Sequence, residues 1–289
     1  MPGSGSGAIA ALGDAIGPDV LAAVQAIYAP EQARIAADVP VAASDLRYGD
    51  DERHTLDLYR PGEGGGAAPV LLFVHGGGFV RGDKRSPDDP FNAHVGRWAA
   101  RHGMIGAVMN YRRAPDHGWP AGGADVAAAI DWLHRNVADH GGDPARIVAM
   151  GTSAGAVHVA TALMLRGATL GAAAVVLLSG LYGHTPIDAR DALYYGDATD
   201  YGARMPRDAV AAATLPMFVA CAQYDPPRFQ RETIGLLADR LERHGTLPPA
   251  TILSGHNHYS LAMHLGTADT RLSDAILAFL VDNAIVERT

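Results

Sequence analysis

The sequence predicts an α/β protein built around a mainly parallel sheet flanked by helices. Short continuous apolar runs recur along the chain, as expected for strands buried on both faces. Helical patterns separate these runs, and strands that alternate with helices are typical of βαβ units. The apolar runs span residues 70–74, 105–109, 147–150, 173–178, 217–220 and 251–253, and the clearest helical patterns span 124–136, 156–165 and 228–244.

The N-terminal part of the chain precedes this alternation. The first seven residues are rich in Gly and Ser and predict a flexible leader, and residues 8–39 carry apolar residues at mixed helical spacing, which predicts one or two short helices. Residues 45–48 and 55–59 then predict an antiparallel pair of strands at one edge of the sheet. We therefore divide the chain into a leader and helical cap segment, 1–44, and a catalytic domain, 45–289.

One long interval between two core strands lacks a strand pattern. Residues 180–215 contain several tyrosines and prolines but no clear strand. Such excursions are often binding loops or lids, and a partly helical surface connection is the alternative. We expect a small cap insertion around residues 183–214.

The composition excludes several classes of protein. The chain has 289 residues, of which 48% are hydrophobic and 19% charged, with a net charge of −8. It shows no basic patch of the kind that nucleic-acid binding requires, and no apolar run nears the roughly 18 residues that span a membrane. The single cysteine, Cys221, excludes an internal disulfide and follows an apolar run. We expect a cytoplasmic protein that binds neither nucleic acid nor membrane, with a homodimer left open.

Residues 151–155 read Gly-Thr-Ser-Ala-Gly between a predicted strand and a predicted helix. Gly-x-Ser-x-Gly in this context marks a tight turn that raises a serine hydroxyl above the edge of the sheet. Side chains at 151 or 155 would clash with neighbouring backbone, and the amide of Ala154 lies at a helix N-terminus that favours negative charge. Ser153 is therefore the candidate nucleophile.

Residues 75–78 read His-Gly-Gly-Gly at the end of another predicted strand. Glycine lets the backbone approach a ligand closely and direct its N–H groups toward it. This loop is a candidate second half of an oxyanion hole. The alternatives are a turn that serves packing alone and a phosphate-binding loop, although the Gly-Lys-Ser/Thr ending of the latter is absent.

Three motifs together resemble the hormone-sensitive-lipase-like branch of the α/β-hydrolases. They are HGGGF at 75–79, NYRRAPDHGWPAGGADV at 110–126, and GTSAG at 151–155, and the resemblance covers roughly residues 45–285. It implies the α/β-hydrolase fold, with Ser153 as nucleophile and the amides of Gly77, Gly78 and Ala154 as the oxyanion hole.

Two features depart from this branch. Thr152 replaces the Asp of its commonest variant, and the interval after the nucleophile is short, which implies a small cap. Residues 75–84 and the small cap also resemble the kynurenine-formamidase-like hydrolases. An amidase or arylformamidase therefore stays open beside an esterase.

The serine needs a base, and the base needs an acid that orients it. In this fold the chain order is Ser, then Asp or Glu, then His. Asp225 follows the predicted strand 217–220, whereas Asp197 and Asp200 lie in the insertion with no strand before them. Asp225 is therefore the candidate acid.

Two histidines follow the last predicted strand, in Gly-His-Asn-His-Tyr-Ser at 255–260. The resemblance favours His258 as the base, because an aromatic and then a small polar residue follow it. His256 is then expected to be a loop residue or a contact supporting the site. A zinc pair would need further suitable ligands, so neither a metal nor a cofactor is expected.

These residues predict a serine hydrolase of carboxylic esters with short to medium acyl chains, acting through Ser153, His258 and Asp225 and an acyl-enzyme. Phe79, Tyr182 and Tyr224, each beside a catalytic motif, are candidates to line the substrate pocket. A ligand-binding receptor on the same fold typically lacks a member of the triad, and an acyltransferase stays open. The expected partner is a small-molecule ester.

Overall fold

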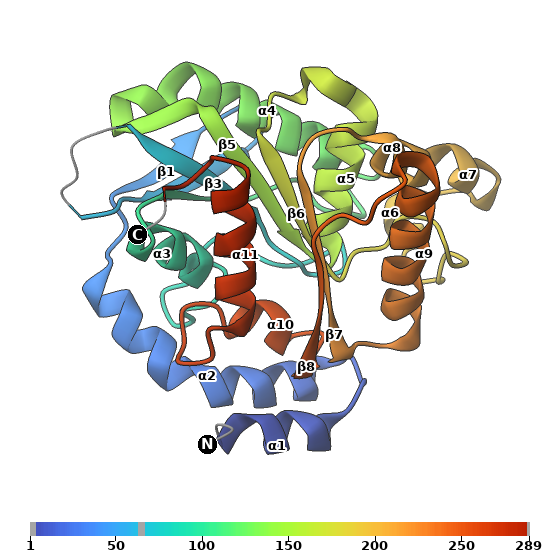
Figure 1. Cartoon of the computed structure of the whole chain (residues 1–289), viewed down its shortest axis with the longest axis horizontal. Helices are drawn as coiled ribbons and strands as arrows, with labels where there is room; N and C mark the ends of the chain where they lie inside the picture. The colour runs from blue at the N-terminus through green and yellow to red at the C-terminus, as the bar shows by residue number, and fades with distance from the viewer. Residues whose placement is uncertain (1–3, 63–66, 288–289) are drawn as a thin grey trace.

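The computed structural model describes residues 4–62 and 67–287, and an eight-stranded sheet forms its centre (Figure 1). The strands lie in the order β1-β2-β4-β3-β5-β6-β7-β8. At one edge β1 pairs antiparallel with β2 and β2 pairs antiparallel with β4, and all other neighbours are parallel. Their bounds are β1 Ala43–Arg47, β2 Thr55–Tyr59, β3 Ala68–Val74, β4 Ile105–Met109, β5 Gly142–Thr152, β6 Ala174–Leu178, β7 Met217–Tyr224 and β8 Ala250–Asn257. The predicted mainly parallel sheet is confirmed.

Helices cover both faces of the sheet. One buried core joins the sheet to α4, α5, α8 and α9, and a second joins its other face to α3, α10 and α11. The bounds are α3 Ala93–Arg101, α4 Ala121–Asn136, α5 Ala154–Arg166, α8 Arg207–Ala212, α9 Pro227–His244, α10 Ser260–Met263 and α11 Arg271–Asp282. The apolar runs fill these cores because each parallel strand is buried on both faces.

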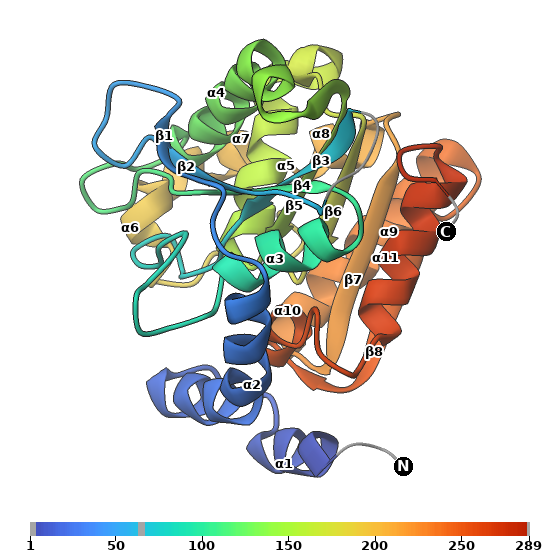
Figure 2. The ribbon, with the colours of Figure 1, turned by 90° about the vertical axis from the view of Figure 1, so that its left-hand side faces the viewer.

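Two N-terminal helices lie together at one end of the sheet in both views (Figures 1 and 2). Helix α1 spans Ser4–Leu12 and contacts β8, and α2 spans Pro18–Asp38 and contacts α3 and α10. The expectation of a flexible leader is wrong for residues 4–7, which belong to α1, and residues 1–3 lie outside the described ranges. Ile9 is fully buried, so packing supports this Gly- and Ser-rich helix.

Several strands run further than their apolar segments. Strand β5 begins at Gly142, which pairs with Ala68, although residues 142–146 form no apolar run and include a proline. Strand β8 continues to Asn257, so His256 lies in this strand and not in the loop where it was expected. Pairing of β8 with β7 extends to Tyr224 and Asn257, which explains the greater length.

The interval before β7 holds short helices and, within the described ranges, no strand. These are α6 Ala192–Tyr195, α7 Tyr201–Arg204 and α8. Its first residues are tied to α9, because the backbone N–H groups of residues 182–185 all donate to the buried carboxylate of Glu232, with 2.7 Å from Tyr182 and 2.8 Å from Thr185. The insertion therefore starts from a fixed point on the helix that follows Asp225.

Candidate active site

Ser153 stands at the turn between β5 and α5 in a strained backbone conformation. Its φ of 54° and ψ of −122° lie outside the regions that L-residues ordinarily adopt. A Cβ on Gly151 would lie 2.4 Å from the carbonyl carbon of Gly155, and a Cβ on Gly155 would lie 2.0 Å from the carbonyl oxygen of Val74. Both glycines are thus required by close backbone contact, as the motif predicts.

The structure brings Ser153, His258 and Asp225 into one chain of hydrogen bonds. The Nε2 atom of His258 is 2.9 Å from Ser153 Oγ, and its Nδ1 atom is 2.7 Å from Asp225 Oδ1. An ionised carboxylate only accepts hydrogen bonds, so Nδ1 carries the proton and the lone pair of Nε2 faces the hydroxyl. His258 can therefore accept the proton of Ser153.

The carboxylate of Asp225 is held on a second side by groups that the sequence did not reveal. Its Oδ2 atom accepts hydrogen bonds from Ser179 Oγ at 2.5 Å and from the N–H of Ala222 at 2.7 Å. Asp225 and Ser179 are both fully buried. Ser179 directly follows β6, and this position at the carboxyl edge of the sheet was the only available signal.

The glycine loop after β3 has a backbone conformation that favours glycine. Gly77 and Gly78 have positive φ values of 135° and 58°, and a Cβ on Gly77 would lie 1.9 Å from the carbonyl oxygen of Arg81. In the described ranges, neither glycine N–H donates to a backbone carbonyl. Ala154 is the first residue of α5, where the N–H has no partner inside the helix. Amides are thus available at all three predicted positions.

A small aromatic cluster lies beside the nucleophile elbow. Phe79 stacks on Tyr194 of α6 with 4.4 Å between ring centroids, and both rings pack with Tyr195, Ala154 and Val157. Phe79 therefore packs against the start of α5, and its role in lining a substrate pocket stays a prediction. Phe229 of α9, which no sequence pattern indicated, has its ring centroid 4.3 Å from that of His258.

Tyr182 and Tyr224, both predicted to line the substrate pocket, lie in different surroundings. Tyr182 does not line the site, because it is fully buried in the core with Val210 and Leu236. Its neighbour Leu181 instead joins the aromatic cluster. Tyr224 is half-buried at the end of β7, one residue before Asp225, and its role stays a prediction.

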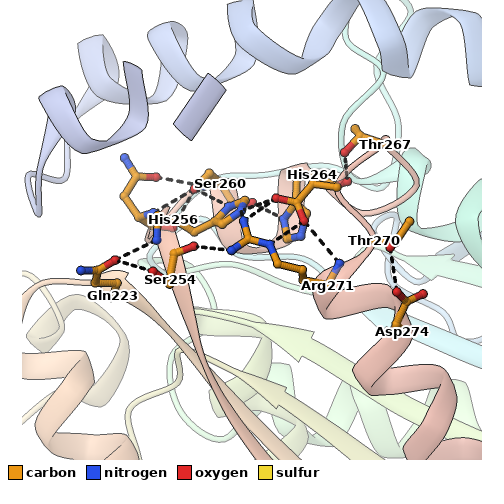
Figure 3. A network of polar contacts seen from close by, with 12 residues as sticks. Gln223, Ser254, His256, Ser260, His264, Thr267, Thr270, Arg271 and Asp274 are labelled. Carbon is orange, nitrogen blue, oxygen red and sulfur yellow. Dashed lines mark hydrogen bonds and ion pairs between the residues drawn. The ribbon is translucent and has the colours of Figure 1, made fainter. Parts of the chain in front are cut away.

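His256 belongs to a separate polar network (Figure 3). Its Nδ1 atom is 3.1 Å from Ser260 Oγ, and its Nε2 atom is 3.1 Å from Asp269 Oδ2. Burial lowers the pKa of His256 and lowers that of nearby His264 to about 3. The two histidines of the 255–260 segment therefore have different surroundings, and only His258 contacts Ser153.

Known proteins match one segment of this chain in sequence. The family model BD-FAE matches residues 56–172, which include the glycine loop and Ser153 but neither Asp225 nor His258. Isoprenylcysteine alpha-carbonyl methylesterase ICME of Arabidopsis thaliana is 37% identical over 122 residues, 42% of this chain and 27% of that protein. Esterase LipQ of Mycobacterium tuberculosis is 39% identical over 120 residues, 40% of this chain and 27% of that protein. The chain thus matches about a quarter of the length of these curated relatives.

Structural similarity to solved proteins covers a larger part of the chain than the sequence matches do. A hyperthermophilic esterase from the archaeon Pyrobaculum calidifontis superposes with a TM-score of 0.68 at 22% identity, covering 92% of this chain and 92% of that one. The resemblance noted in the sequence is confirmed, and the fold is that of the α/β-hydrolases. No helix in the described ranges is long and apolar enough to cross a bilayer.

Proposed function

We propose that this chain, an α/β-hydrolase similar to the hormone-sensitive-lipase-like esterases, is a serine carboxylesterase. The observation that carries the proposal is the unbroken hydrogen-bond chain from Ser153 Oγ through His258 to Asp225, built on a strained nucleophile elbow. The names of ICME and LipQ, a methylesterase and an esterase, support ester substrates.

The geometry supports an acyl-enzyme mechanism. Ser153 Oγ attacks the ester carbonyl while His258 Nε2 takes the hydroxyl proton, and the amides of Gly77, Gly78 and Ala154 stabilise the oxyanion. Collapse of the tetrahedral intermediate breaks the bond to the alcohol, which leaves with the proton from His258. Water then attacks the acyl-enzyme with His258 as base, the bond from the acyl carbon to Ser153 Oγ breaks, and Oγ takes the proton from His258 as the acid product leaves. Asp225 stabilises the imidazolium in both halves of the reaction.

The aromatic cluster supports a preference for short to medium acyl chains. Phe79, Tyr194 and Tyr195 are all buried, and they fill the space next to Ala154 at the start of α5. The short helices of the insertion form no long lid. We expect turnover to fall for long acyl chains.

The proposal is tested with a series of p-nitrophenyl esters and a fluorophosphonate probe. Wild type should hydrolyse the short esters and be labelled at Ser153, and Ser153→Ala should lose both properties while keeping its circular dichroism spectrum. Labelling at another serine would overturn the assignment. A matched pair of an ester and an anilide shows whether amides are also cleaved.

A further inference from the structure

We propose that His256, His264 and Asp269 form a binding site for a divalent transition-metal ion such as Zn²⁺, separate from the Ser153–His258–Asp225 site. Each of the three residues offers one ligand atom, and these atoms lie within 4.8 Å of one another. Imidazole nitrogens and a carboxylate oxygen are ligands that Zn²⁺ prefers. Figure 3 shows the two histidines in one network at the end of β8 and in the turns that follow it.

His264 supplies the strongest evidence, because one of its ring nitrogens is buried without a partner. Its Nδ1 atom is 2.7 Å from the backbone carbonyl of Ser260, which only accepts, so Nδ1 carries the proton. The opposite atom, Nε2, then presents a lone pair. That lone pair has no hydrogen-bond partner among the described residues, and His264 is fully buried. A buried polar atom without a partner is costly, and a metal ion would satisfy it.

His256 is oriented in a similar way. The Nδ1 atom of His256 contacts the hydroxyl of Ser260, and the Nδ1 atom of His264 contacts the carbonyl of the same residue. In both histidines Nδ1 is the nitrogen that faces away from the proposed ion. Metal-ligating histidines almost always have such a partner at the second nitrogen. The two rings lie 4.2 Å apart between centroids, and His256 Nε2 is 3.1 Å from Asp269 Oδ2. The ligands are therefore pre-oriented.

Arg271 occupies the position of the cation in this structure. Its Nη2 atom lies 2.5 Å from Asp269 Oδ2 and 3.2 Å from His256 Nε2. The Arg271 side chain is half exposed, so the guanidinium can move into water when a metal ion binds. Binding is then an exchange of one cation for another at the carboxylate. Removal of Arg271 should strengthen metal binding, which a purely structural network would not show.

The experiment uses the full chain without a histidine tag, after treatment with a chelator. One titration uses Co²⁺, whose visible absorption reports ligand geometry, and a second uses Zn²⁺ and is followed by calorimetry. We expect one ion per chain in wild type. Arg271→Gln should bind at least about tenfold more tightly, whereas Asp269→Asn and His264→Gln should bind at least about tenfold more weakly, as is typical when a ligand or its support is lost. His134→Gln, which changes an exposed histidine elsewhere, serves as the control and should bind like wild type.

Two results would overturn the site. The first is the absence of Co²⁺ and Zn²⁺ binding in both wild type and Arg271→Gln. The second is binding that Asp269→Asn leaves unchanged. His264→Gln removes a buried side chain, so if this variant does not fold, Asp269→Asn decides, because it is nearly isosteric and Asp269 is partly exposed. Neither readout depends on ester turnover, so the outcome is independent of the proposed function.

Discussion

Ser179 holds Asp225 on the side opposite the histidine. Its Oγ donates to Oδ2 at 2.5 Å, while His258 Nδ1 donates to Oδ1 at 2.7 Å, and the carboxylate has no exposed surface. A buried carboxylate needs several donors to stay ionised. Ser179 thereby fixes the carboxylate in the plane from which it orients His258.

Removal of this donor should slow turnover without removing the triad. Ser179→Ala should lower kcat by about tenfold or more, because a hydrogen bond to a charged group contributes about 1.5–3 kcal/mol. Steady-state kinetics on a short p-nitrophenyl ester measures the effect, and Ser254→Ala, which changes an exposed serine of β8, is the control. Unchanged kcat in Ser179→Ala would show that Ala222 N–H alone positions the acid.

Alanine variants of the two histidines in the 255–260 segment should differ strongly in ester turnover. His258→Ala should lose nearly all turnover, because Ser153 then has no proton acceptor, whereas His256→Ala, measured with chelator present, should keep most of it. Asp225→Asn should lose about 10⁴-fold, since the wrong imidazole tautomer results. The double variant His258→Ala/Asp225→Asn should be little worse than His258→Ala, because triad members act as a unit. An inactive His256→Ala beside an active His258→Ala would reverse the assignment.

The nucleophile elbow should not accept a methyl group at Gly155. Gly155→Ala places a Cβ 2.0 Å from the carbonyl oxygen of Val74, which is backbone and cannot rotate away. Overpacking of this kind costs about 1–3 kcal/mol, so the urea midpoint should fall and activity with it. Gly202→Ala in α7 is the matched control, because its Cβ would meet nothing within 4 Å. Equal midpoints for the two variants would contradict the close contact.

Stability should fall as the pH drops below neutrality. Burial lowers the pKa of His75 and His94 to about 4 and that of His158 and His264 to about 3, from an ordinary 6.5. Between these values the unfolded chain binds more protons than the folded chain, so each histidine removes up to about 1.4 kcal/mol per pH unit as the pH falls from about 6.5 toward its folded pKa.

Urea unfolding at about pH 7 and about pH 5 measures this slope. His158→Gln should make the dependence shallower, because one buried imidazole is removed. His134→Gln, at an exposed position, should leave the slope as it is in wild type. A slope that is identical in all three proteins would show that other groups cause the acid sensitivity.

The fold and the Ser-Asp-His set could be predicted because both depend on where parallel strands end. Continuous apolar runs mark such strands, and Ser153, Asp225 and His258 each directly follow the end of one strand. The contacts of Ser179 and Phe229 could not be predicted, because they join elements far apart in the chain and no local pattern encodes them.

The incorrect predictions have local physical reasons. Leu181 and Tyr182 are neighbours in the chain but pack in different buried clusters, and sequence alone did not show that Leu181 joins the aromatic cluster. The apolar run ends at Leu253, which predicts a loop at His256, yet β8 continues through pairing with β7. Its partners His264 and Asp269 come from the turns after β8, whose path the sequence does not indicate.

The carboxylate of Glu232 fixes the start of the insertion independently of Asp225, which precedes α9. Four consecutive N–H groups end on it, so residues 182–185 keep one conformation whatever follows them. Helix α9 carries both this anchor and Phe229, which touches the base. The segment from Pro186 to Pro206 carries Tyr194 and Tyr195 of the aromatic cluster, so we expect its exchange to change substrate range. Ser153, His258 and Asp225 all lie outside this segment.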